Sequence, residues 1–419
     1  MKETARKEGA KEAPMLETLG EVIRGELRAF VVSAGMAALT AMLEAERTML
    51  CGPRYAHNAD RRASRGGHVA GELVLGGRRV QVRRPRARGV DGQEFVLPSW
   101  RAFSDEDPLG ARALEQMLIG VSTRRYERSL EEAPPEVVTR GTSKSAVSRR
   151  FVATTKAQMG SWLGRDLSNI DLVVLMIDGV HIDDHVLLIA LGIDAQGEKH
   201  VLGCCEGATE NATACTALLS DLRDRGLRTE RTTLVVLDGA KALLKAVREV
   251  LGSRALVQRC QVHKLRNVVD QLPEEMRVSV RAAIREAYGC TDAARAKKLL
   301  QNLARRLRDS QPGAAASLEE GLDETLTVMR LGLPKNLARV LSTTNAIENL
   351  IGAVRRLGKR VRRWRNGKMI LRWTVAAISD ASTRFRRIAG ARAAMSKLVV
   401  ALRSRDPQPS QLESQSEAA

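Results

Sequence analysis

The chain has 419 residues, of which 44% are hydrophobic, so it can bury the cores of two or three domains and is not disordered as a whole. Aromatic residues make up only 3%, which argues against a surface that binds single-stranded nucleic acid by base stacking. Lys and Arg number 68 against 49 Asp and Glu, and the net charge of +19 predicts a polyanionic partner, most often nucleic acid. A basic face that is merely solvated is the alternative.

The N-terminal sequence and the cysteines bear on the compartment. Residues 1–15 are charged and Ala-rich, and we expect them to be flexible rather than a secretory leader. We expect no apolar run to reach the length of a membrane span, and the six cysteines show no repeated spacing. These features predict a cytoplasmic protein with reduced thiols.

Residues 16–104 combine helical spacing with a basic hairpin. Apolar residues recur at helical intervals up to about residue 50. Two short β runs then flank Gly76-Gly77 within residues 72–88, and a two-glycine turn accepts the positive φ that a tight hairpin needs. We expect Arg83 and Arg84 to contact DNA from this β-ribbon; an exposed basic edge strand is the alternative.

Residues 105–168 have the pattern of a helix-turn-helix DNA-binding region. Gly120 supplies a turn, Ser122 a cap, and a helix is expected after it. A second helix follows Pro134-Pro135 and begins with Ser, Lys and Arg. Its exposed residues are the expected DNA contacts: Lys144, Ser148, Arg149 and Arg150. An ordinary helical hairpin would give a similar pattern.

From residue 169 the sequence predicts a mixed sheet. Residues 171–179 form a buried strand that ends in Asp178-Gly179, and 185–193 and 199–204 follow through tight turns, which makes these three strands antiparallel. Helices separate them from strands at 233–239 and 255–260, and helical crossovers make those strands parallel. The expectation is a five-stranded α/β domain over residues 169–272 and 341–390.

The rest of the chain is predicted to be largely helical. Residues 273–340 read as an all-helical insertion, and a further helix runs to about residue 365, capped by the cluster at 342–345. From Asn349 to Ser379 there are no acids, and we expect DNA phosphates to be held there by Arg355, Arg356, Lys359 and Arg362. Residues 391–419 are the end of the last helix and a disordered tail.

Three acids are candidates for catalysis. Asp178 and Asp238 each follow an apolar strand and precede a glycine, and their strands can be neighbours in a mixed sheet; Asp-Gly turns are the simpler explanation for either alone. Close carboxylates need a compensating cation, and Mg²⁺ prefers oxygen ligands. Glu348, with Arg355 and Arg362 seven and fourteen residues beyond it, fits a third ligand, so that two ions could serve displacement at a phosphodiester.

Other acids and a Cys/His pair stay open on the residues alone. Asp183, Asp184 and Asp194 are rival acids in or near strand turns. Cys260 and His263 are spaced as half of a zinc site, but no second pair lies at zinc-finger spacing.

Seven motifs resemble those of one family. They occur in order between about 170 and 390: MIDGVHI, LGIDAQGEKHVLG, EGATENATA, LLSDLRDRGL, VVLDGAKAL, VQRCQVHKLRNV and STTNAIENL. On these motifs the chain resembles bacterial insertion-sequence transposases of the Mutator-like group, which cut and join DNA. The N-terminal half matches more weakly.

The resemblance implies a ribonuclease-H-like fold with an Asp178, Asp238 and Glu348 triad that holds two Mg²⁺ or Mn²⁺ ions. It also implies double-stranded DNA partners, namely terminal inverted repeats and target DNA, and a dimer or larger assembly. Cys260 and His263 match a Cys-x-x-His element of the family, which we expect to support the site or touch DNA. A transposase-derived regulator without catalysis and a ribonuclease-H-like nuclease are the alternatives.

Overall fold

The computed structural model describes residues 29–56, 61–89, 91–104, 108–207, 212–388 and 391–406. The chain divides into two compact units, Met1–Lys156 and Ala157–Ala419. This division falls before residue 168, where the sequence suggested the boundary of the sheet domain. The expected flexible N-terminus, residues 1–15, and most of the expected tail lie outside the described residues.

The N-terminal unit is built on the predicted hairpin. Strands β1 (Ala63–Leu75) and β2 (Arg78–Gly89) pair antiparallel, with Leu75 opposite Arg78, so only Gly76 and Gly77 form the turn. Their φ angles of 57° and 81° are the reason that glycine is needed there. The short strands β3 (Glu94–Phe95) and β4 (Thr139–Arg140) also pair with β2, and a helix, Ala29–Cys51, packs through Leu39 and Leu43 against the hairpin core.

The helix Ala29–Cys51 corrects the expectation that no apolar segment reaches the length of a membrane span. It is long and apolar enough to cross a membrane, whereas no segment was expected to be so. A single such helix near the N-terminus is weak evidence for a membrane span, because core helices and signal sequences satisfy the same criterion.

The prediction of a helix after Ser122 is wrong. Helices α2 (Pro98–Ser104), α3 (Pro108–Ile119) and α4 (Lys144–Leu163) form, but residues 120–143 contain only the 3-10 turn η1 (Glu127–Ser129) and β4. Tyr126 is buried there, and its hydroxyl donates to the Gly77 carbonyl at 2.9 Å. This long-range anchor fixes an irregular segment, and α3 and α4 are not joined by the short turn of a helix-turn-helix motif.

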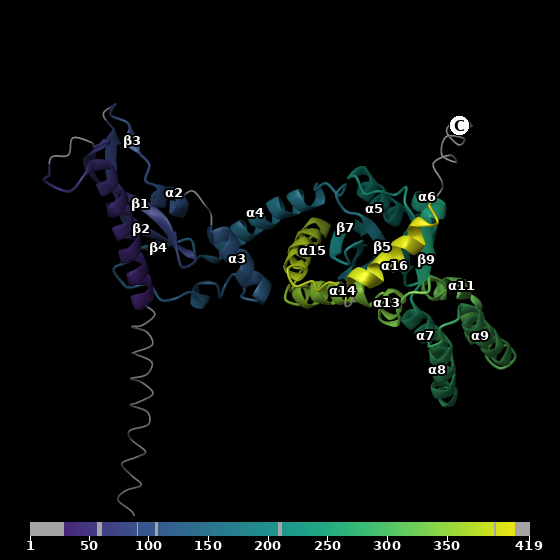
Figure 1. Ribbon diagram of the computed structural model, residues 1–419. Helices are drawn as coiled ribbons and strands as arrows, with labels where there is room; N and C mark the ends of the chain where they lie inside the picture. The colour runs from purple at the N-terminus through teal and green to yellow at the C-terminus, as the bar shows by residue number, and fades with distance from the viewer. Residues whose placement is uncertain are drawn as a thin grey trace, which may run out of the picture. The chain divides into compact units, whose positions relative to one another are not determined.

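The C-terminal unit contains the five-stranded mixed sheet that the sequence predicts (Figure 1). Its strands lie in the order β7-β6-β5-β8-β9. Pairing is antiparallel from β7 to β5 and parallel from β5 to β9, as the connections require. The strands are β5 (Leu172–Ile182), β6 (His185–Asp194), β7 (Lys199–Gly207), β8 (Thr233–Leu237) and β9 (Ala255–Arg259).

Strand β5 does not end at Asp178-Gly179 as expected. Asp178 pairs with Ile189 in the middle of the ladder, and the chain turns only after Ile182, where Asp183 has a φ of 53°. Val180 and Ile182 are buried in the same core as Met176, so their burial favours continuing the strand past the Asp-Gly pair. Because alternate residues share a face, Asp178 lies on the face of Met176 and Val180.

Helices cover both faces of this sheet. Helices α5 (Ala212–Asp224) and α6 (Lys241–Leu251) pack on the face that carries Leu175 and Ile177. The opposite face, which carries Met176 and Asp178, is covered by α14 (Asn345–Gly358), α15 (Gly367–Ser382) and α16 (Ala391–Arg403). The helix that contains Glu348 is therefore packed on the face that contains Asp178.

The segment between β9 and α14 is helical throughout its regular structure, as predicted for residues 273–340. It has its own apolar core and protrudes from the sheet in Figure 1. Its helices are α7 (Gln261–Val269), α8 (Glu274–Tyr288), α9 (Ala293–Leu307), α10 (Pro312–Glu319), α11 (Leu322–Thr325), α12 (Thr327–Arg330) and α13 (Lys335–Leu341).

Helix α14 ends earlier than expected. It stops at Gly358, so Arg362 lies in the following loop and does not share a helical face with Glu348 and Arg355. Continuing the helix would place Arg355 beside Lys359 and Arg356 beside Arg360 at i,i+4 spacing, where like charges are destabilising. The dense positive charge thus favours a loop over a longer helix.

Candidate active site

The register of the parallel strands brings Asp178 and Asp238 side by side. Met176 pairs with Val236, and Val236 with Gln258. The residues two positions after these three are Asp178, Asp238 and Cys260, which therefore form the next row of the same face, with neighbouring strands about 4.8 Å apart. The Cys260 N–H donates to the Leu237 carbonyl at 2.7 Å, which ties Cys260 to the end of β8.

Asp178 lies among the other predicted acids. It is half-buried, and burial raises the pKa of its carboxyl to about 6; the negative charges of Asp238 and Glu348 raise the pKa further. The N–H of Gly179, which donates to Asp178 Oδ1 at 2.8 Å, and the charge of His263 act in the opposite direction. The structure thus brings the three acids together where their charges act on one another.

Asp238 is held by the turn that the sequence predicts. Strand β8 ends just before it, and Gly239 has a φ of 107°, a conformation that glycine adopts without strain. Asp238 Oδ1 accepts a hydrogen bond from the Ala240 N–H at 2.9 Å. One oxygen of Asp238 and one of Asp178 are therefore fixed by backbone donors.

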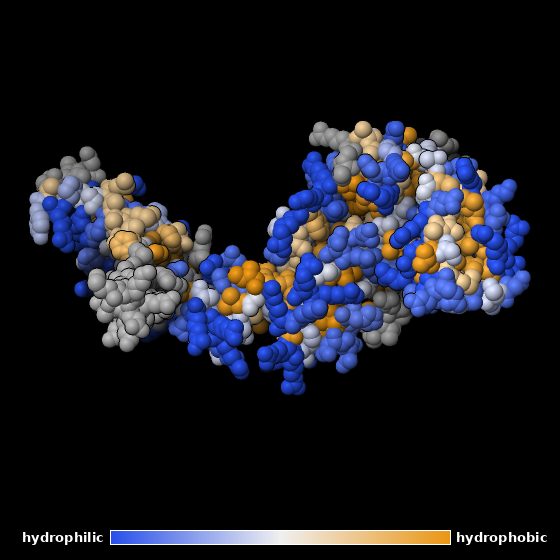
Figure 2. All heavy atoms as spheres, turned by 90° about the horizontal axis from the view of Figure 1, so that it is seen from below, coloured by the Kyte–Doolittle hydropathy of each residue, from blue (hydrophilic) through white to orange (hydrophobic). Residues whose placement is uncertain are grey.

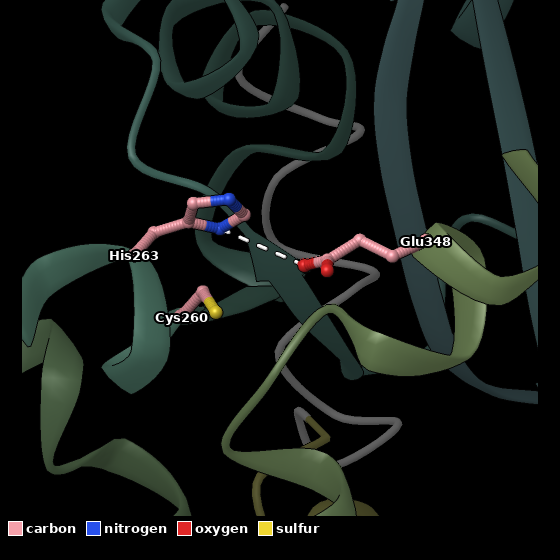
Figure 3. A group of neighbouring side chains, drawn as sticks. All are labelled: Cys260, His263 and Glu348. Carbon is pink, nitrogen blue, oxygen red and sulfur yellow. Dashed lines mark ion pairs between the residues drawn. The ribbon is translucent and has the colours of Figure 1, made fainter. Parts of the chain in front are cut away.

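Glu348 belongs to a second group of contacts with Cys260 and His263. Figure 3 shows the three side chains converging from the start of α7 and the first turn of α14, and their candidate ligand atoms lie within 4.8 Å of one another. His263 Nδ1 lies 3.8 Å from Glu348 Oε1, and Cys260 is fully buried. Sulfur, imidazole and carboxylate could together ligate zinc.

A hydroxyl lies at the centre of this group. Thr344 Oγ1 is 2.5 Å from Glu348 Oε1, 3.3 Å from Cys260 Sγ and 3.3 Å from His263 Nδ1. The three side chains already share a hydrogen-bonding partner at the position between them. This arrangement favours a supporting role for Cys260 and His263 over zinc ligation.

Cys260 and His263 also shift each other's pKa. Burial alone would raise the pKa of the Cys260 thiol, but hydrogen bonds from His263 and Thr344 outweigh it and lower the pKa. The hydrogen bond with Cys260 raises the pKa of His263 despite partial burial, and the charges of Cys260, Glu348 and Asp238 add to the effect. Positive charge on His263 is thus favoured beside the acids.

The sequence did not point to Thr344 as a residue of the candidate site. The cluster at 342–345 was expected to cap α14, but the structure corrects this: Thr344 stands at the N-cap without a side-chain cap bond. Ser342 Oγ donates to Ala338 O, Thr343 Oγ1 to Val340 O, and Thr344 Oγ1 faces Glu348. The available signal was the unusual number of hydroxyls just before the candidate glutamate.

The predicted DNA-contact residues fall into two groups. Most are exposed: Arg83, Lys144, Ser148, Arg149, Arg355, Arg356, Lys359 and Arg362. Two are partly buried and engaged within the chain. Arg84 pairs with Glu94 at 2.6 Å and lies over the Trp100 ring, and Arg150 donates to the Gly141 carbonyl at 2.5 Å. The face in Figure 2 is mostly hydrophilic, with apolar patches between the polar side chains.

The rival acids Asp183, Asp184 and Asp194 lie at turns between strands. Asp194 Oδ1 accepts the N–H groups of Gln196 and Glu198, both at 2.9 Å, and Asp194 Oδ2 lies 2.7 Å from His200 Nε2. These bonds define the β6–β7 turn. Asp183 and Asp184 are exposed in the β5–β6 turn.

The sequence is similar to those of known proteins over most of its length. Residues 21–387 match the family described as Transposase, Mutator family. The chain is 29% identical over 355 residues to the transposase for insertion sequence element IS256 in transposon Tn4001 from Staphylococcus aureus, covering 81% of this chain and 86% of that protein. It is 32% identical over 244 residues to the transposase for insertion sequence element IS6120 from Mycolicibacterium smegmatis, covering 57% and 73%. The chain belongs to the Mutator family of transposases.

Proposed function

We propose that this transposase cuts the ends of its own insertion sequence and joins their 3′-hydroxyls to target DNA, with Asp178, Asp238 and Glu348 as its catalytic carboxylates. The observation that carries the proposal is geometric: the register of β5 and β8 brings Asp178 beside Asp238, and α14, which bears Glu348, packs on the face of the sheet that carries Asp178. The strand order, with three antiparallel strands followed by two parallel ones, supports a ribonuclease-H-like assignment for the sheet.

The three acids have the chemistry of a site for hard divalent cations. All offer carboxylate oxygens, and the pKa of Asp178 is raised first by burial and then by the charges of Asp238 and Glu348, both of which a bound cation would offset. Bound Mg²⁺ or Mn²⁺, two per site, would activate the attacking oxygen and stabilise the leaving oxygen. The backbone bonds to Asp178 and Asp238 keep one oxygen of each fixed and so orient the other.

DNA binding would use the exposed cations on both units. We infer that Arg355, Arg356, Lys359 and Arg362 hold phosphates next to Glu348, because they follow it on α14 and in the next loop. The N-terminal unit would bind the terminal inverted repeats through the hairpin and the start of α4. Both ends of the element must be held side by side for cutting and joining to target DNA, so we propose that the active form is a dimer or larger.

The test is cleavage of a DNA duplex that carries the element's end sequence, with Mg²⁺ or Mn²⁺. Wild-type protein should produce a nick with a free 3′-hydroxyl, and Asp178→Asn, Asp238→Asn and Glu348→Gln should each abolish it while binding the duplex with unchanged affinity. Asp184→Asn is the matched control, since this exposed acid lies on the same hairpin. EDTA should stop the reaction and a zinc-selective chelator should not.

The other outcomes identify the alternatives. A wild-type protein that binds ends without cutting them is a transposase-derived regulator. Equal cutting of unrelated duplexes or of RNA in a hybrid indicates a nuclease. Cleavage by Asp178→Asn would show that the triad is wrong, and loss of activity with the zinc-selective chelator would favour zinc at Cys260 and His263.

A further inference from the structure

The side chain of Thr344 does not make the hydrogen bond that a threonine at a helix N-cap usually makes. An N-cap hydroxyl ordinarily accepts a hydrogen bond from a backbone N–H of the first turn. Here the side chain makes no such bond, although its carbonyl accepts from the N–H groups of Ile347 and Glu348, both at 3.0 Å. The hydroxyl is fully buried and directed instead at Cys260, His263 and Glu348.

The single proton of this hydroxyl limits how the contacts can be made. The shortest contact, 2.5 Å, is to Glu348 Oε1, and a carboxylate can only accept, so the hydroxyl donates there. With its proton directed to Glu348, the oxygen is free to accept from His263 Nδ1 at 3.3 Å, and Cys260 Sγ, also 3.3 Å from the oxygen, accepts from the Thr344 N–H. The hydroxyl thus bridges His263 and Glu348.

Backbone contacts place this hydroxyl at a junction between distant parts of the chain. The Thr344 N–H donates to Cys260 Sγ at 3.4 Å, and the Gln261 N–H donates to the Ser342 carbonyl at 2.9 Å. These bonds attach the start of α14 to the end of β9, across the whole helical insertion. Cys260 in turn lies in the row of Asp178 and Asp238.

We propose that Thr344 is the positioning residue of the active site, whose hydroxyl orients the Glu348 carboxylate and links it to the Cys260–His263 pair. The proposal rests on the proposed function. Glu348 is 37% exposed in its side chain and starts a helix, so without this bond its carboxylate can rotate toward solvent. Thr344 itself acts through Glu348 and does not touch the reacting atoms.

The test compares Thr344→Val, which replaces the hydroxyl by a methyl group of similar size, with Thr344→Ser, which keeps it. Misplacement of a catalytic group by about 1 Å can cost about 10²-fold in rate, so Thr344→Val should cut end DNA about 100-fold more slowly at saturating DNA, with the Kd for the duplex within about two-fold. Thr344→Ser should restore cleavage to within a few-fold of wild type. Thr343→Val, which removes a hydroxyl that donates to the Val340 carbonyl at 3.4 Å, should cut like wild type.

A second readout needs neither metal nor DNA. The chain has six histidines, and in ¹⁵N-histidine-labelled protein the His263 signal should report an Nδ1–H that loses its acceptor in Thr344→Val and regains it in Thr344→Ser. Wild-type cleavage by Thr344→Val, or equal impairment of the Val and Ser variants, would overturn the positioning role. If Asp178→Asn also cleaves in the same assay, the proposed function has failed; if only Thr344→Val cleaves, the failure concerns Thr344 alone.

Discussion

Replacing Asp178 by Asn should stabilise the metal-free protein, although it should abolish catalysis. Burial and the neighbouring acids raise the pKa of Asp178 to about 6 from an ordinary 3.8, so its ionised form is disfavoured in the folded state. At about 1.4 kcal/mol per pKa unit, this difference amounts to roughly 3 kcal/mol. The cost is absent below pH 4, grows between pH 4 and pH 6, and is complete above pH 6. Asparagine is uncharged and carries none of it.

Thermal unfolding with EDTA at pH 4 and pH 8 tests this reasoning. For a domain of this size, about 3 kcal/mol corresponds to a Tm about 6–12 °C higher for Asp178→Asn at pH 8, with little difference at pH 4. Added Mg²⁺ should raise the Tm of wild type more than that of the variant, because the cation compensates the charge that asparagine lacks.

A matched change at the start of the same strand should act in the opposite direction. Asp171 Oδ1 pairs with Arg231 at 3.0 Å and with Arg403 at 2.8 Å, so Asp171→Asn should lower the Tm at pH 8. An Asp178→Asn protein that melts below wild type at pH 8, or by the same margin at both pH values, would refute an electrostatic cost at Asp178.

Two further predictions concern the basic surface and its support. DNA affinity should fall about 10³–10⁵-fold between 50 and 200 mM salt if about six to ten phosphates are neutralised. Arg355→Ala should reduce the slope of log affinity against log salt concentration by about one. Arg84 is paired with Glu94, so Arg84→Ala should leave that slope nearly unchanged. A Cβ on Gly367 would overlap the Glu206 carboxylate, which pairs with His185, so Gly367→Ala should lower the Tm by displacing that carboxylate from its partner. Adding Glu206→Ala should recover part of the loss, and a Gly367→Ala protein as stable as wild type would contradict this contact.

The strand order was predictable because it follows from connection lengths. Tight turns oblige neighbouring strands to pair antiparallel, and helical crossovers oblige them to run parallel, whatever their side chains. That argument alone made the strands of Asp178 and Asp238 possible neighbours, and the structure has them paired. The all-helical insertion was equally accessible, since its apolar residues repeat at helical spacing over a long segment.

The element ends were less predictable because distant contacts decide them. Asp178-Gly179 has the composition of a turn, yet β5 continues because Val180 and Ile182 are buried by helices far away in the sequence. The segment after Ser122 has local helix signals, but the buried Tyr126 fixes it in another conformation through Gly77. Thr344 likewise fits a helix cap locally, and only the folded chain brings Cys260 and His263 to its hydroxyl.

Asp178 lies within β5 and Asp238 immediately follows the neighbouring strand β8, whereas Glu348 lies on a helix that begins after the insertion. Strands within a sheet cannot slide past one another without breaking their ladder, so the two aspartates form a fixed pair. A change in the spacing of the three proposed catalytic acids would therefore require displacement of α14. Because the N–H groups of Thr344 and Gln261 tie the start of α14 to the end of β9, the helical insertion begins and ends beside these acids.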